Sequence, residues 1–229
     1  MNKNLTEIAF ILDRSGSMAP VTEAAITGFN EFLRDQQKTE GQARLTLVLF
    51  DNEYLLPLDG IPVQEAISLD TTTYIPRGST ALLDAIGTTV DHIGSRISAM
   101  AEPDRPGQVI VAILTDGFEN SSEKFTWKDI SEKILEQTNT YKWQFLFLGA
   151  NQDAIATAAN LNIAAGNASN YVGDTGGTYS GQKAMSRKAT ALRRMASGGP
   201  VSVRQKADAA APLSAIVAEE DAESRKAGQ

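Results

Sequence analysis

The sequence predicts an α/β fold in which an open, mostly parallel sheet carries helices on both faces. Four short apolar runs are nearly continuous in hydrophobicity, which is typical of parallel strands buried on both sides. Segments with helical spacing alternate with these runs, as expected for strands connected by helices. The runs cover residues 8–12, 45–50, 109–114 and 143–148. The chain of 229 residues is long enough for one large core or two small ones.

The connections between the runs follow two patterns. Apolar residues recur at helical spacing over residues 21–33, 82–97 and 127–134, and Thr126 is placed to cap the third of these helices. Residues 55–61 follow the second run after a short polar link. Because so short a link cannot make a parallel crossover, we expect these residues to form an antiparallel hairpin with the second run.

The last third of the chain predicts fewer regular elements. We expect a helix over residues 153–160, an edge strand near 170–172 and a basic helix over 179–195. A Ser-Gly-Gly-Pro stretch then ends regular structure, and the residues after it are rich in Ala and in charges of both signs. A loosely docked helix is one interpretation of that segment and a mobile tail is the favoured one. We therefore assign residues 1–196 to one domain and 197–229 to a flexible tail.

The composition excludes several kinds of site. The chain has one His and no Cys. It therefore cannot form a disulfide, an iron–sulfur cluster, a thiolate zinc site or a cysteine nucleophile, and any metal must be held mainly by oxygen. The formal net charge of -7 argues against nucleic acid as a partner, because phosphate binding needs a basic surface.

The apolar segments are too short for targeting or membrane insertion. The first run, residues 8–12, is shorter than the apolar region of a signal peptide. No later stretch approaches the roughly 18 apolar residues that span a bilayer. We therefore expect a cytoplasmic protein with no membrane partner.

Oxygen-bearing side chains follow two of the predicted strands and precede one predicted helix. Asp13, Ser15 and Ser17 come directly after the first run. A Thr-Asp-Gly motif, which contains Asp116, ends the run at 109–114, and Thr80 lies just before the helix that starts near residue 81. Carboxylate and hydroxyl oxygens are hard ligands suited to Mg²⁺ or Mn²⁺. The three segments together therefore predict a divalent metal site.

In this order, the motifs resemble the metal-ion-dependent adhesion site of the von Willebrand factor type A domain. All five positions of the family site are filled, and the resemblance covers about residues 5–195. The positions are Asp13, Ser15, Ser17, Thr80 and Asp116. The resemblance implies a six-stranded, doubly wound sheet in the order 3-2-1-4-5-6 with the third strand antiparallel, which agrees with the predicted hairpin.

The resemblance also implies a role for each residue. Ser15 and Ser17 would bind the ion directly, Asp13 and Asp116 directly or through water, and Thr80 when a ligand is engaged. One coordination position would stay open for an Asp or Glu carboxylate of a partner protein. With only two charged ligands, the ion would still attract such a carboxylate strongly. The resemblance further allows a role as an accessory subunit of an ATPase complex.

Each motif has an ordinary structural interpretation when it is taken alone. Asp13 and Ser15 could form a turn, Thr80 could cap a helix and Asp116 could belong to a simple turn. Three such accidents would have to coincide to reproduce the full set, so we favour the metal site. Asp84 could orient a neighbouring loop or be a plain helix acid. We expect the site to be rimmed by Glu119, Asn151 and Asp153, which follow strand ends.

A different class of function uses similar residues. A metal-dependent hydrolase of phosphate esters could use the same pocket, but it needs a second carboxylate near the first or a nucleophile with a base. Ser15 and Ser17 stand where that second carboxylate would be, and His92 is predicted to lie exposed on its helix. The glycines before Gln182 lack the Lys that a phosphate-binding loop requires. We therefore predict a non-enzymatic protein-interaction module, with the hydrolase as the alternative.

Overall fold

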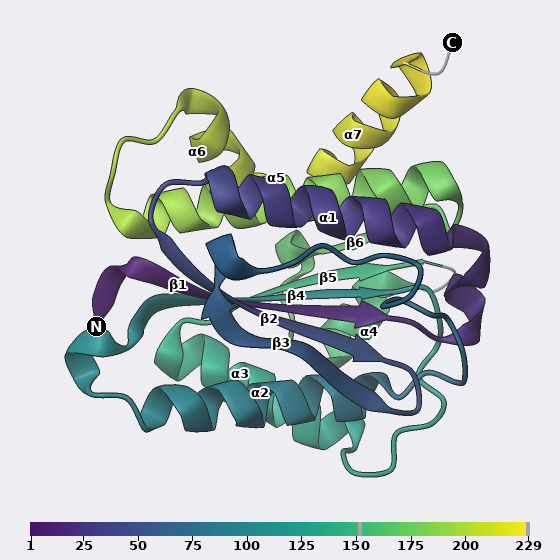
Figure 1. Ribbon diagram of the computed structural model, residues 1–229, viewed down its shortest axis with the longest axis horizontal. Coiled ribbons are helices and arrows are strands. Elements are labelled where there is room, and N and C mark those ends of the chain that lie inside the picture. Colours follow the sequence, from purple (N-terminus) through teal and green to yellow (C-terminus); the bar gives the residue numbers. More distant parts are fainter. Residues whose placement is uncertain (151–152, 228–229) are drawn as a thin grey trace.

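Within the residues that the structure describes, six strands form one twisted sheet (Figure 1). The computed structural model describes residues 1–150 and 153–227. The strand order is β3-β2-β1-β4-β5-β6, and every neighbouring pair is parallel except β2 and β3. The strands are β1 (Asn2–Asp13), β2 (Gln42–Phe50), β3 (Tyr54–Pro62), β4 (Pro106–Thr115), β5 (Gln144–Gly149) and β6 (Ala168–Asn170). This confirms the predicted sheet and its hairpin.

Helices cover both faces of the sheet, as predicted. One face carries α1 (Thr22–Lys38) and α5 (Thr175–Ser197). The other carries α2 (Leu82–Ser98), α3 (Trp127–Tyr141) and α4 (Ala154–Asn160). Short 3₁₀ helices are η1 (Gly16–Val21), η2 (Val63–Glu65), η3 (Glu102–Asp104) and η4 (Ala165–Asn167). No helix in the described part of the chain combines the length and apolar character needed to cross a membrane.

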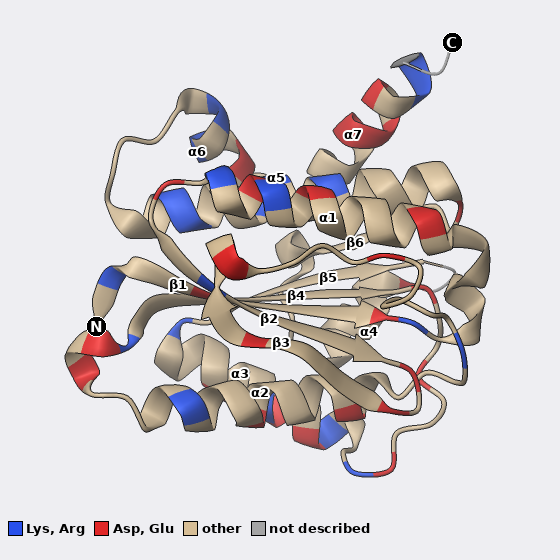
Figure 2. Cartoon of the chain, in the orientation of Figure 1, with Lys and Arg blue, Asp and Glu red and all other residues tan. Residues whose placement is uncertain are grey.

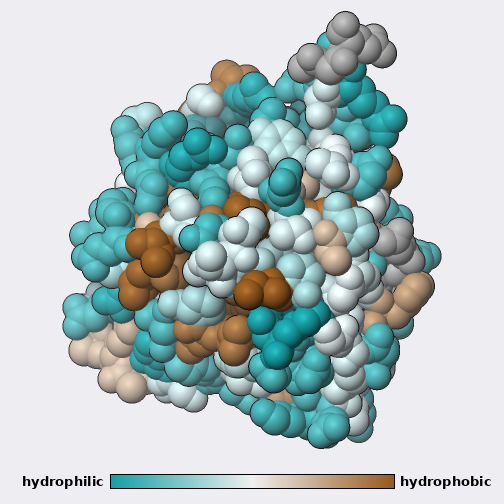
Figure 3. All heavy atoms as spheres, turned by 45° about the vertical axis from the view of Figure 1, so that its right-hand side comes forward, coloured by the Kyte–Doolittle hydropathy of each residue, from teal (hydrophilic) through white to brown (hydrophobic). Residues whose placement is uncertain are grey.

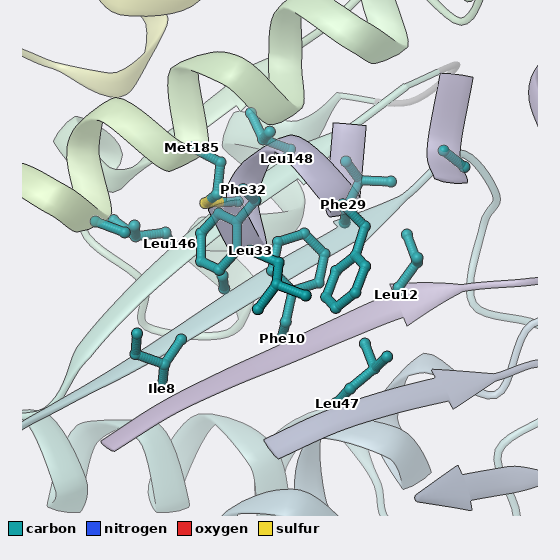
Figure 4. Packing of buried hydrophobic residues seen from close by; sticks show 14 of the residues in the cluster. Ile8, Phe10, Leu12, Phe29, Phe32, Leu33, Leu47, Leu146, Leu148 and Met185 are labelled. Carbon is teal, nitrogen blue, oxygen red and sulfur yellow. The ribbon is translucent and has the colours of Figure 1, made fainter. Parts of the chain in front are cut away.

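The central strand β1 is buried on both faces, which explains its continuous hydrophobicity. Phe10 faces α1, where its ring packs edge-on against Phe29 and Phe32 with centroid separations of 5.4 and 4.7 Å (Figure 4). Ile11, the next residue, belongs to the separate cluster under α2 and α3. Alternate side chains of one strand therefore join two cores, and no position in the run can be polar without cost.

Capping residues fix several helix ends. Thr126 and Asp129 form a capping box at the start of α3, as the sequence predicts. Asp174 accepts a hydrogen bond from the Gly177 N–H, so α5 begins four residues before its predicted start. The edge strand β6 lies two residues before its predicted position. Its last residue, Asn170, turns its side chain to accept a hydrogen bond from the α4 N-terminus at Ala154.

The flexible tail expected over residues 197–229 is wrong for the described residues. The segment forms α6 (Val203–Ala210) and α7 (Leu213–Ala227), which pack on α5. Leu213, Ile216 and Val217 are buried in the same core cluster as Phe10. Their spacing places them on one stripe of α7. That stripe is short, which is why composition alone favoured a tail.

Ion pairs hold the two added helices against α5. The Arg187 guanidinium lies 2.6 Å from a carboxylate oxygen of Asp208 and 2.8 Å from one of Glu220. Lys188 Nζ donates to the carbonyl oxygens of Ala209 and Ala211 at 2.8 and 2.6 Å. Figure 2 shows that charges of both signs gather on these helices. The mixed charge of the segment therefore serves docking, because its acids meet the bases of α5.

Candidate metal centre

Two neighbouring strands bring Asp13 and Asp116 together at the carboxyl edge of the sheet, on the right in Figure 1. In the β1–β4 register, Leu12 lies opposite Leu114, so the next residues, Asp13 and Thr115, end the strands side by side. The Thr115 hydroxyl donates to Asp13 Oδ2 at 2.6 Å. Asp116 follows immediately. β1 and β4 are also the parallel neighbours between which the strand order changes direction, with β2 and β3 on one side and β5 and β6 on the other, and open α/β sheets bind ligands at that point.

The loop after β1 places two hydroxyls beside these carboxylates. Asp13 Oδ1 accepts a hydrogen bond from the Ser15 N–H at 2.6 Å, which holds the loop in a tight turn. Ser15 Oγ lies 3.0 Å from Ser17 Oγ. Ser17 Oγ in turn donates to Asp116 Oδ1 at 2.6 Å. Four of the five predicted residues are thus connected through hydrogen bonds.

The fifth residue, Thr80, lies on a loop that is hydrogen-bonded to both others. The Gly78 carbonyl accepts from the Gly16 N–H at 3.1 Å, and the Thr80 N–H donates to Asn120 Oδ1 at 2.9 Å. A Cβ on Gly117 would lie only 2.9 Å from Thr80 Oγ1 and 3.4 Å from Ser17 Oγ. The structure therefore brings all five predicted residues together, and the third loop needs a glycine to let the oxygens approach.

Asp51, a buried acid just after β2, holds the loop that carries Thr80 in place. Asp51 is fully buried and pairs with Arg14 and with Arg77, each at 3.0 Å. Its carbonyl also accepts from the Ala81 N–H at 2.9 Å. The loop has a positive φ of 68° at Gly78, where a side chain would meet Asn52 at 2.1 Å. Sequence reasoning missed Asp51 because no motif marks it.

The site carries negative charge in a buried setting. Asp13 is fully buried, and this burial raises the pKa of its carboxyl from 3.8 to about 6, although the Thr115 hydroxyl and the Ser15 N–H lower it in part. Burial raises the pKa of Asp116 as well. Throughout the described residues, no Lys, Arg or His side chain forms an ion pair with Asp13. A bound cation would supply the missing positive charge.

The donor set fits a small divalent cation. It consists of two carboxylates and three hydroxyls, which are the hard oxygen ligands that Mg²⁺ and Mn²⁺ prefer. Adjacent oxygens around a Mg²⁺ ion with bonds near 2.05 Å would be about 2.9 Å apart. The Ser15–Ser17 oxygen separation of 3.0 Å is close to that value. In the part of the chain described here, no three His, Cys, Asp or Glu side chains form such a group, so the hydroxyls are essential to it.

Asp84 orients a neighbouring loop, which was one of its two sequence interpretations. Its carboxylate oxygens accept hydrogen bonds from three successive backbone N–H groups, each at 2.9 Å. The donors are Glu123, Lys124 and Phe125. This acid therefore fixes the segment that leads from the third loop into α3.

The residues expected to rim the site have other contacts. Glu119 accepts hydrogen bonds from the N–H groups of Leu83 and Ser122, at 2.9 and 2.8 Å, so it caps α2 and folds its own loop. Asp153 caps α4 through the Ala156 N–H. Both carboxylates therefore hold the backbone of nearby helices and loops. Asn151 lies outside the described residues.

His92 lies outside the three loops of the site. It is half-exposed on α2, and its Nε2 lies 2.8 Å from Asp59 Oδ1 on β3. The sequence predicted an exposed helix position, and the pairing with Asp59 adds a partner that it could not predict. The only histidine of the chain is thus engaged away from the site.

Two tyrosines support the strand ends and were missed by sequence reasoning. The Tyr74 hydroxyl donates to the Asp13 carbonyl at 2.6 Å, and the Tyr171 hydroxyl donates to the Thr115 carbonyl at 3.3 Å. Burial raises the pKa of both phenols well above 10, so they remain hydrogen-bond donors. Both come from loops without a local signal.

Comparisons with known proteins find similarity at the level of structure. No family model matches the sequence, and no curated protein matches it. The manganese-loaded TRAP protein of Plasmodium vivax superposes with a TM-score of 0.57 at 16% identity, over 78% of this chain and 72% of that one. A von Willebrand factor type A protein from Catenulispora acidiphila gives a TM-score of 0.51 at 17% identity, over 81% of this chain and 42% of that one.

A third solved structure extends the same similarity. The ArnB paralog VWA2 from Sulfolobus acidocaldarius gives a TM-score of 0.50 at 16% identity, over 81% of this chain and 45% of that one. This chain spans less than half the length of the Catenulispora and Sulfolobus structures. The strand order and these similarities show that the chain has the fold of von Willebrand factor type A domains.

Proposed function

We propose that this chain is a protein-interaction module that binds an acidic side chain of a partner protein through Mg²⁺ or Mn²⁺. The observation that carries the proposal is the convergence of five oxygen-bearing side chains at the carboxyl edge of the sheet. Those residues are Asp13, Ser15, Ser17, Thr80 and Asp116. The fold shared with a manganese-loaded protein supports the same assignment.

The ligand types favour binding of a further carboxylate. When bound, the ion supplies a positive centre that attracts an acidic side chain. Asp13 and Asp116 would balance its charge, while the three hydroxyls add no negative charge to repel an incoming acid. A carboxylate of the partner would therefore gain a strong, charge-assisted contact. The buried position of Asp13 keeps water from screening that contact on the protein side.

The same geometry supports binding in preference to hydrolysis of phosphate esters. A hydrolase would need a base or a further carboxylate beside the ion. His92 is engaged with Asp59, and Glu119 is held by backbone N–H groups. The two side chains outside the five residues that were candidates for a base are thus engaged elsewhere.

Selection from a displayed peptide library tests the proposal. A random library is passed over the immobilised chain in Mn²⁺, and bound clones are eluted with EDTA. We expect the eluted peptides to share an Asp or Glu, and we expect Asp13→Asn to abolish their recovery while Asp91→Asn, at an exposed acid on α2, preserves it.

Two results would contradict the proposal. One is that the peptides eluted with EDTA share no acidic residue, or that EDTA elutes no peptide. The other is release of nitrophenol from p-nitrophenyl phosphate that depends on Mn²⁺ and is lost in Asp13→Asn, because it would establish the hydrolase instead.

A further inference from the structure

Exposed apolar side chains occur on all three loops that carry the five oxygen-bearing residues. Phe118, two residues after Asp116, is 65% exposed. Ile75, on the loop that leads to Thr80, is 53% exposed. Ala19 and Pro20, which follow Ser17, are exposed as well. Figure 3 turns this edge of the sheet partly forward and shows separate hydrophobic patches among hydrophilic residues.

Close contacts bring the three loops that carry these side chains together at one point. The first two loops are joined by the Arg77 N–H, which donates to the Arg14 carbonyl at 2.8 Å, two residues after Ile75. The loop after β4 meets both other loops at Gly117, the residue before Phe118. Gly117 lies close to the hydroxyl oxygens of Thr80 and Ser17. A single exposed apolar side chain is ordinary. The occurrence of such side chains on every loop around one site favours an interaction surface there.

Two charged side chains near this surface, Arg77 and Glu119, already have partners within the protein. Arg77, on the same loop as Ile75, forms ion pairs with Asp51 and with Glu53. Glu119 is held by backbone N–H groups of its own loop and of α2. Both charged groups are therefore already engaged within the protein, Arg77 by carboxylates and Glu119 by backbone N–H groups. Recognition next to the ion would therefore depend on apolar contact.

We propose that the partner's acidic residue is flanked in its own segment by large apolar side chains, which pack on Phe118 and Ile75. This inference rests on the proposed function and names the class of partner: a segment in which an Asp or Glu stands between residues such as Leu, Ile or Phe. Apolar contacts around the carboxylate exclude water from it, as the rim of an interface does for a central polar contact. The low local dielectric strengthens the bond between the carboxylate and the ion.

Two labelled peptides of equal length and charge test the inference. One carries Asp between Leu residues and the other carries Asp between Gly residues, and fluorescence anisotropy measures the affinity of each in Mn²⁺. We expect the Leu-flanked peptide to bind about tenfold or more tightly, since burial of one large apolar side chain corresponds to at least that factor. Phe118→Ser and Ile75→Ser should each reduce the preference several-fold. Leu135→Ser, at a 44% exposed position on α3, should keep it.

The outcomes separate this inference from the proposed function. If both peptides bind equally in Mn²⁺ and both are released by EDTA, the inferred apolar contacts with Phe118 and Ile75 are overturned and the proposed function stands. A preference that persists in Phe118→Ser and Ile75→Ser would likewise overturn the assignment to these residues. If neither peptide binds in Mn²⁺, both proposals fail together.

Discussion

Asp13→Asn is expected to raise the free energy of unfolding of the metal-free protein at pH 7 by up to about 3 kcal/mol. The buried carboxyl has a pKa of about 6 against an ordinary value of 3.8, a difference of roughly two units at about 1.4 kcal/mol each. At pH 7 the wild type must hold this carboxylate ionised and buried without a cation. Asn has the same shape and no charge. Its amide oxygen can accept from the Ser15 N–H, and its NH₂ can donate to the Thr115 hydroxyl, which reverses the direction of that hydrogen bond.

The stability difference between Asp13→Asn and the wild type should depend on pH. Because the pKa of Asp13 is higher in the folded chain, the folded state binds the proton more tightly, and the contribution of Asp13 to stability falls as pH rises from about 4 to about 6. Below about pH 4 the carboxyl is protonated in both states, so the advantage of the variant should vanish. Urea unfolding in EDTA across this range measures it, with Asp91→Asn as the control. If the variant were less stable than the wild type at pH 7, the buried carboxylate of Asp13 would not destabilise the metal-free fold, contrary to this prediction.

Leu213→Ala is expected to lower the free energy of unfolding by about 2–4 kcal/mol. Leu213 is fully buried where α7 packs on the core of the domain, so truncation would leave a cavity in a closely packed region. Chemical unfolding measures the effect. The matched control is Leu135→Ala on α3, where the side chain is 44% exposed and the expected change is within about 0.5 kcal/mol.

This second prediction decides whether the end of the chain belongs to the domain. Equal stability of Leu213→Ala and Leu135→Ala would mean that α7 does not dock in solution, and that the flexible tail expected from composition is correct after all. A selective loss in Leu213→Ala would establish α7 as part of the core.

The sheet and the convergence of oxygen-bearing side chains at its edge were predictable because their signals are local. A strand buried on both faces must be apolar at every position, so β1 is visible as a run that Asp13 ends. Parallel strands end at a common edge, so polar residues after two such runs converge even though Asp13 and Asp116 lie far apart in sequence. Thr80 was noticed from its place just before a predicted helix, and the structure places it beside Gly117.

The features that were not predicted depend on contacts between distant segments. Docking of α7 needs its short apolar stripe together with the bases of α5, and Arg187 gives no sign in sequence that it will face Asp208 and Glu220. Asp51 acts through Arg14 and Arg77, which belong to two different loops. Such pairings become visible only once the sheet has set the positions of the loops.

Manganese binding to the wild type and to Asp13→Asn tests the central claim most directly. Calorimetric titration of each protein with Mn²⁺, followed by competition with Mg²⁺, measures affinity and stoichiometry without a partner. The account predicts one ion per wild-type chain and an affinity lower by at least about tenfold in Asp13→Asn, since a charged ligand is lost. Because that variant is expected to be the more stable of the two, the loss could not be ascribed to unfolding. Equal affinity of the two proteins, or no binding to the wild type, would contradict the account.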